Sequence, residues 1–166
     1  MPTLIEMTGG VARAVEDSLR HISDDDDAGT GDVIVSLTRF QADGERLLAK
    51  GRRVGVRIAP GEEVEALAYD LPRLAVVAVE FPKHLDGRGY TSARLLRERL
   101  GFKGQVRAVG DVLREQAMFL VRCGFDAFEV SDGASAQEWQ AAVGRYRHVY
   151  QRAADGRPPA FVEREG

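Results

Sequence analysis

The chain has 166 residues, which suits one domain that buries about two thirds of the surface exposed by its unfolded form. Apolar residues make up 44% and charged residues 30%, and the formal net charge is -3. A membrane protein is not expected, because the longest apolar run, residues 74–79, is far shorter than the roughly 20 residues that cross a bilayer. The negative charge argues against nucleic-acid binding, which calls for a basic surplus. No secretory signal is visible, so we expect a cytoplasmic protein.

The N-terminal part of the chain lacks the regular pattern of the rest. Gly9 and Gly10 favour a hairpin, with a helix over residues 11–20 as the alternative. Four adjacent aspartates then predict a solvated linker, and consecutive carboxylates on a loose loop make a weak case for a metal site. We predict a hairpin or irregular segment with this acidic linker over residues 1–31, an α/β domain over 32–150, and an extended tail over 151–166.

A regular alternation begins at residue 33. Short β-branched runs predict strands over residues 33–37, 53–58, 74–80, 105–109 and 125–130. Helical spacing predicts helices over residues 39–50, 62–70, 91–100, 111–123 and 135–148. Strands that alternate with helices indicate βαβ units. We expect a three-layer α/β fold with a mainly parallel five-stranded sheet, and a partial β/α barrel is the alternative, because both are built from the same units.

Two of the predicted helices carry further signals. Ser135 and Glu138 have the spacing of a capping box, and an apolar stripe that includes Trp139 and Tyr146 follows them. In the helix over residues 111–123, the run AMFLV is apolar almost all round, so it should be buried on most sides.

The stretch FPKHLDGRGY, residues 81–90, connects the third predicted strand to a helix. At ten residues it exceeds the usual connection of about two to six residues, which suggests a working role. Ligands of open parallel sheets bind outside the carboxyl ends of the strands, where helix N-termini and basic side chains both favour an anion. We therefore predict a site for a small anionic or phosphorylated ligand formed by Arg39, Lys83, Asp86, Arg88, Tyr90, Arg94, Asp111 and Arg114.

A purely structural interpretation of the same loop stands beside this one. Asp86 would pair with Arg88 or Arg94 to pin the loop, and Tyr90 would pack on the sheet edge. His84 is a single imidazole with no second ligand in view, so a surface or loop-fixing role is favoured over catalysis.

Three residues of the helix predicted over residues 111–123 have structural interpretations as well. Asp111 after Gly110 suits an N-cap. Arg114 lies in the first turn, where a cation opposes the helix dipole, so it is expected to meet a carboxylate or a bound anion. Cys123, the only cysteine, is expected to pack as an apolar group, and a thiol pair within one chain is excluded.

One motif imitates a dinucleotide fingerprint. Gly87, Gly89 and Ser92 spell GxGxxS between a strand and a helix. However, a Rossmann turn has its first glycine almost at the strand end, whereas FPKHLD intervenes here. A flavin or nicotinamide site is therefore the minor alternative.

The stretch EFPKHLDGRGYTSARLLRERLGFKGQVRAVGDVLREQAMFLVRCGFDAFEV resembles a bacterial family of unknown function, number nine hundred thirty-four among such domains. The family pattern combines FPK, DGR, a string similar to YSQARLLRERY, GDVLR and RCGFDAFE, and this chain departs from it at Thr91. The resemblance is specific over residues 74–130 and extends to VIVSLTRF at 33–40, whereas the first thirty and last thirty residues match little.

The resemblance implies a place in assimilatory sulfite or sulfate reduction. Members are labelled probable oxidoreductases of sulfite reduction, and relatives lie beside genes for sulfite reductase and phosphoadenylylsulfate reductase, which are candidate partners. The residues themselves offer no thiol pair, no iron-sulfur ligand set and no convincing nucleotide loop. We therefore expect an accessory or anion-binding role, with an oxidoreductase that uses a bound flavin or nicotinamide as the alternative.

Overall fold

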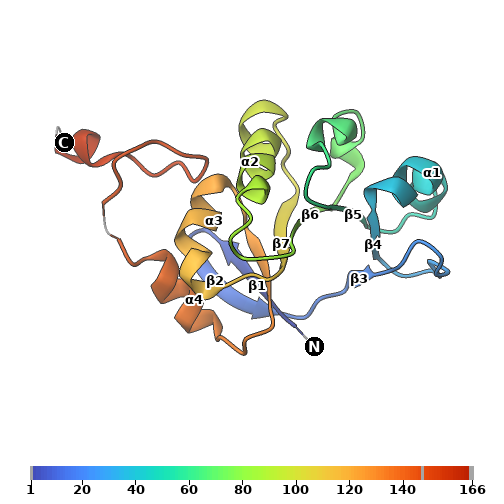
Figure 1. Ribbon diagram of the computed structural model, residues 1–166, viewed down its shortest axis with the longest axis horizontal. Helices are drawn as coiled ribbons and strands as arrows, with labels where there is room; N and C mark the ends of the chain where they lie inside the picture. The colour runs from blue at the N-terminus through green and yellow to red at the C-terminus, as the bar shows by residue number, and fades with distance from the viewer. Residues whose placement is uncertain (1, 147, 165–166) are drawn as a thin grey trace.

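A computed structural model describes residues 2–146 and 148–164. Its elements form one curled sheet with helices along it (Figure 1). The strands are β1 (Thr3–Thr8), β2 (Val11–Val15), β3 (Arg20–His21), β4 (Val33–Ser36), β5 (Val54–Ile58), β6 (Val76–Phe81), β7 (Gln105–Gly110) and β8 (Ala127–Val130). The helices are α1 (Leu37–Leu48), α2 (Arg88–Arg94), α3 (Ala117–Cys123), α4 (Ala136–Val143) and α5 (Ala160–Glu163).

The sheet is a half-barrel of eight strands in the order β2-β1-β8-β7-β6-β5-β4-β3. Strands β3 to β8 are parallel, whereas β1 pairs antiparallel with both β8 and β2. Each parallel strand neighbours the next in the chain, and right-handed connections then place the helices on one face. The α/β class is confirmed. The sheet has eight strands rather than five, and the partial barrel describes it better than three layers do.

The two faces of the sheet are packed differently. On the outer face, side chains such as Val56, Val77 and Phe128 join the helices in one large core, where Trp139 of α4 stacks on Phe128 with 4.5 Å between ring centroids. The concave face holds a much smaller apolar cluster, composed of Leu19, Ile34, Val76, Ala78 and Val109. The remaining cover of this face comes from the N-terminal part of the chain.

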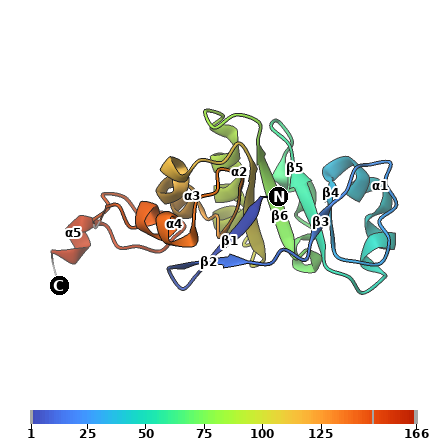
Figure 2. The ribbon, with the colours of Figure 1, turned by 90° about the horizontal axis from the view of Figure 1, so that it is seen from below.

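The chain crosses the concave face between β2 and β3. These strands lie at opposite edges of the sheet, so residues 16–19 must run across it, as Figure 2 shows. We call residues 16–22 the crossing segment. Its Leu19 is buried in the small concave cluster. The acidic loop that follows, residues 23–29, is held through its backbone carbonyls by two buried arginines, Arg39 and Arg52.

The predicted elements are largely confirmed, with three corrections. The hairpin turns at Gly9 and Gly10, both with positive φ. The helix predicted over residues 62–70 is instead two short 3₁₀ turns, Val64–Leu67 and Leu71–Arg73. The last predicted helix has its capping box but ends at Val143, so Tyr146 lies outside it. The helix predicted over residues 111–123 begins only at Ala117, after a 3₁₀ turn over Arg114–Gln116, and its run AMFLV is less buried than expected, because Phe119 is 58% exposed.

Residues 144–164, of which Arg147 is not described, form a C-terminal arm that projects from the body (Figures 1 and 2). Val149 and Pro159 form a parallel bridge within this arm. Its middle part lies against α3, where the backbone N of Ala154 donates to the carbonyl of Arg122 at 3.1 Å and the Arg122 guanidinium pairs with Asp155 at 3.2 Å. Among the described residues, no helix is long and apolar enough to span a bilayer.

Candidate functional site

The predicted site centres on the loop between β6 and α2, and this loop is fixed to the neighbouring connection between β7 and α3. The carboxylate of Asp111 accepts from both the backbone N and the ring Nδ1 of His84, each at 2.9 Å. Gln116 Nε2 donates to the His84 carbonyl at 2.6 Å and to the hydroxyl of Tyr90 at 2.8 Å. The loop-fixing role of His84 is thus confirmed. The N-cap assigned to Asp111 is wrong, because Leu113 and Gln116 precede the helical turns here.

Asp86 and Arg88 form the second fastening of the loop. Asp86 Oδ1 accepts from the backbone N and the Nε of Arg88, and Oδ2 accepts from Nη2 at 2.6 Å. Hydrogen bonds from the side chain and the backbone N of Arg88 lower the pKa of Asp86 to about 2, from its ordinary value of 3.8. The predicted pairing of Asp86 with Arg88 is therefore confirmed, and it leaves the guanidinium at the surface with part of its charge compensated.

The fixed loop presents two side chains that do nothing for its own structure. Leu85 is 85% exposed, although an apolar side chain gains nothing from contact with water. Lys83 is exposed, and within the described part of the chain its ammonium group makes no hydrogen bond or ion pair. Leu85, Lys83 and the guanidinium of Arg88 form what we call the loop surface.

Packing against Phe81 explains two of the three glycines of this region, Gly89 and Gly110, but not Gly87. A Cβ on Gly89 would lie 2.6 Å from the Phe81 ring, whereas a Cβ on Gly87 meets nothing within 4 Å. Gly110 has a φ of +93°, and its Cβ would lie 2.4 Å from the Phe81 carbonyl oxygen. Tyr90 packs on the same ring, edge to face, at 5.5 Å between centroids.

The other predicted site residues do not join the loop surface. Arg39 is buried and donates to the carbonyls of the acidic loop, so it fixes that loop. Arg94 pairs with Glu98 at 3.5 Å and lines a cavity beside the C-terminal arm. Arg114 meets the carboxylate of Glu138 at 3.0 Å, which confirms the carboxylate expected for this cation.

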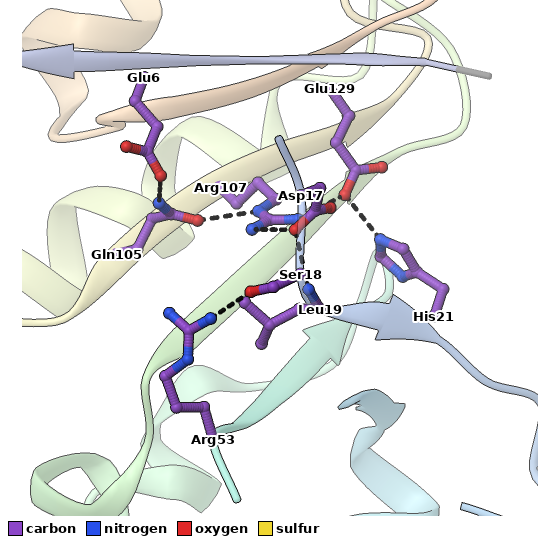
Figure 3. Close-up of polar contacts among 9 residues, drawn as sticks. All are labelled: Glu6, Asp17, Ser18, Leu19, His21, Arg53, Gln105, Arg107 and Glu129. Atoms are coloured by element: carbon purple, nitrogen blue, oxygen red, sulfur yellow. Dashed lines mark hydrogen bonds and ion pairs between the residues drawn. The ribbon is translucent and has the colours of Figure 1, made fainter. Parts of the chain in front are cut away.

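A second polar cluster, which the sequence did not suggest, lies on the concave face (Figure 3). Arg107 of β7 is only 1% exposed and donates to Asp17 at 2.7 Å, to Glu129 at 2.9 Å and to Gln105 at 2.9 Å. Glu129 also lies 2.7 Å from Nε2 of His21. Two carboxylates and an amide oxygen accept from this guanidinium, so its hydrogen-bond donors have partners and its charge is compensated although it is buried.

This concave cluster fastens the crossing segment to the sheet. Asp17 and His21 belong to that segment, while Arg107 and Glu129 stand on β7 and β8. Burial alone would raise the pKa of Glu129, but its hydrogen bonds and charge interactions with His21 and Arg107 lower it overall. The available signal in the sequence was an arginine in the middle of the strand run QVRAV, where a buried strand needs an apolar residue.

We looked among the described residues for a reactive thiol and for a cluster of side chains that could hold a metal ion. Cys123 is partly buried, and burial raises the pKa of its thiol, which disfavours the reactive thiolate. No group of three or more histidine, cysteine or acidic side chains suited to a metal ion occurs in the described ranges.

Two comparisons with known proteins bear on this site. A search of the curated proteins finds no match. The family model described as "Bacterial protein of unknown function (DUF934)" matches residues 55–161. The match extends further toward the C-terminus than the resemblance seen in the sequence, because it includes most of the C-terminal arm, and it starts after the stretch at 33–40. Since this match covers more than half of the chain, the protein belongs to the bacterial family of unknown function DUF934.

Proposed function

We propose that the protein is an accessory binding component of assimilatory sulfite or sulfate reduction, and that it contacts a partner enzyme through the loop surface. The pathway rests on the resemblance to a family labelled for sulfite reduction. The mode of action rests on one observation. A loop fixed at His84 and Asp86 presents an exposed leucine and a lysine whose ammonium group has no partner among the described residues.

Fixing the loop in advance favours binding to a partner. A mobile loop loses conformational entropy when it binds, at about 0.5–1.5 kcal/mol for each immobilised side chain. Here the hydrogen bonds of Asp86, Asp111 and Gln116 have already ordered the backbone. An exposed leucine on such a loop can enter an apolar pocket on the partner, and its burial there removes apolar area from water.

The charges of the loop surface indicate the partner's chemistry. Lys83 and Arg88 flank Leu85, so the complementary surface is an apolar pocket with an acidic rim. The rim charges act mainly on the association rate, and their effect falls as salt screens them. Sulfite reductase and phosphoadenylylsulfate reductase are the candidate partners.

A binding titration with purified sulfite reductase and phosphoadenylylsulfate reductase tests this proposal. Leu85→Ala is expected to weaken binding at least about tenfold, because full burial of a leucine side chain contributes about 1.5–3 kcal/mol. Lys83→Ala is expected to slow association at low salt and to have less effect at high salt. Val11→Ala and Lys103→Ala are matched controls, because both residues are exposed and lie on other elements. Equal binding by the Leu85→Ala variant, or no binding to either enzyme by the unmodified protein, contradicts the proposal.

A small oxyanion is the other ligand that the charges of Lys83 and Arg88 suit. Titration with sulfite, sulfate and phosphate separates the two cases, because an oxyanion site loses affinity in Lys83→Ala but keeps it in Leu85→Ala. The alternative of an oxidoreductase with a flavin or nicotinamide stays a prediction from the motif GRGYTS. Packing against Phe81 already explains Gly89 in that motif. An absorption spectrum of the purified protein without a flavin band, and no thermal shift with nicotinamide nucleotides, would remove it.

A further inference from the structure

A cavity of about 530 Å³ lies between α3 and the C-terminal arm. Met118, Phe119 and Arg122 of α3 contribute to one wall, and residues 146–153 of the arm, without the undescribed Arg147, contribute to the other. The arm is fixed in this position by the backbone bond from Ala154 to Arg122 and by the Arg122–Asp155 ion pair. Cavities that hold small ligands measure about 300–1,000 Å³, so its size suits a small molecule.

Aromatic rings line this cavity and remain open to solvent. Phe119 is 58% exposed, Tyr146 53% and Tyr150 86%. Three large apolar faces in one place are unusual, because aromatic side chains usually bury most of their surface. A planar ring stacked on one of them removes apolar area from water on both partners.

Three arginines line the cavity. Arg94, Arg122 and Arg152 lie there together with His148, and no carboxylate is among the described residues that line it. Arg122 is engaged with Asp155, His148 with Glu163, and Arg94 makes only a long contact of 3.5 Å with Glu98. Arg152 is exposed and makes no hydrogen bond or ion pair within the described ranges. Arginine binds phosphate oxygens in bidentate fashion and stacks on aromatic rings.

We propose that this cavity binds a planar aromatic ring that carries a phosphate group, as in a mononucleotide. The ring stacks on Tyr150 or Phe119, and the phosphate pairs with Arg152 and Arg94. The site is separate from the loop surface and does not depend on the function proposed for it.

Calorimetric titration of the full chain tests the proposal. The probes are FMN and AMP, their phosphate-free counterparts riboflavin and adenosine, and inorganic phosphate. FMN or AMP is expected to bind at least about tenfold more tightly than its phosphate-free counterpart and than inorganic phosphate, because a charge-assisted hydrogen bond adds about that much to affinity. The proposal is overturned if neither FMN nor AMP binds. It is also overturned if neither of them binds more tightly than both its phosphate-free counterpart and inorganic phosphate.

Two variants with matched controls place the ligand in this cavity. Arg152→Ala should reduce the affinity for the phosphorylated ring toward that of its phosphate-free counterpart, with Arg94 left as the remaining phosphate partner, whereas Arg13→Ala, on exposed β2, should leave it unchanged. Tyr150→Ala should weaken binding of both forms of the ring, whereas Tyr69→Ala removes an equally exposed tyrosine elsewhere and should have no effect. All four residues are exposed, and a thermal unfolding curve confirms that each variant is folded. Binding that is unchanged in Arg152→Ala and Tyr150→Ala assigns the ligand to another place and overturns the proposal.

Discussion

The crossing segment and the C-terminal arm are both attached to the body of the sheet, yet they are held in different ways. The crossing segment inserts Leu19 into an apolar cluster and surrounds the buried guanidinium of Arg107. The arm is held near its middle by Arg122, with cavities of about 530 and 520 Å³ beside it and tyrosines exposed. A terminal segment that buries charge and apolar area becomes part of the fold, whereas one held by a few polar contacts leaves room for a ligand.

The largest expected effect is at Arg107. Arg107→Met should lower the free energy of unfolding by about 3–5 kcal/mol, because it leaves the carboxylates of Asp17 and Glu129 without their buried partner. Urea denaturation measures this, and Arg13→Met on an exposed strand is the control. A loss below about 1 kcal/mol would mean that the concave cluster does not fasten the crossing segment.

The motif GRG contains one glycine that is tightly packed, Gly89, and one that has open space around it, Gly87. Gly89→Ala should lower the free energy of unfolding by about 1–3 kcal/mol, because its Cβ would lie 2.6 Å from the ring of buried Phe81. Gly87→Ala should change it by less than about 0.5 kcal/mol, because nothing lies within 4 Å of that Cβ. Equal effects of the two substitutions in thermal or urea unfolding would refute the packing explanation of the motif.

Breaking the attachment of the arm to α3 should affect the arm alone. Arg122→Ala removes the ion pair with Asp155 and the donor to the carbonyl of Gln151, so the arm should open about tenfold more often, at a local cost of about 1.5 kcal/mol. Limited proteolysis at the arm reports this opening, and the cleavage of the crossing segment should stay unchanged. Unaltered cleavage of the arm would show that other contacts hold it.

The smallest effect concerns Asp86 and pH. Its pKa is lowered to about 2 by hydrogen bonds from Arg88, so its stabilising contribution to the loop is present above about pH 4 and is lost as the pH falls through about 2. An NMR titration of the carboxyl group should give this low pKa, and Arg88→Ala should raise it toward 3.8, because only the hydrogen bond from the backbone N of residue 88 would remain. A value near 3.8 in the unmodified protein would show that the loop is not fixed by this pair.

The sequence predicted the parallel strands well, because strands covered on both faces are apolar at nearly every position. It did not place β1 or β3 in the sheet, since pairing between distant segments leaves no local period. The helix over residues 62–70 was also wrong, because the apolar spacing of Val64 and Leu67 suits 3₁₀ turns equally well.

For the candidate site, residue chemistry predicted the pinning of the loop by Asp86 and the fixing role of His84. It did not predict the exposure of Leu85 or the partner of Arg107. Exposure depends on which way a loop faces, and the Arg107 cluster joins residues from three separate parts of the chain, namely the crossing segment, β7 and β8. Neither the exposure of Leu85 nor the partners of Arg107 can be predicted from a local sequence pattern. The ligand itself stays a prediction.

The most direct test of the proposed function is growth of a deletion strain that expresses variants of the loop surface. The account predicts that a strain carrying Lys83→Ala and Leu85→Ala grows on cysteine but poorly on sulfate, while one carrying Val11→Ala and Lys103→Ala grows on both. Full growth on sulfate with the loop-surface variant, at equal protein level, would contradict the account.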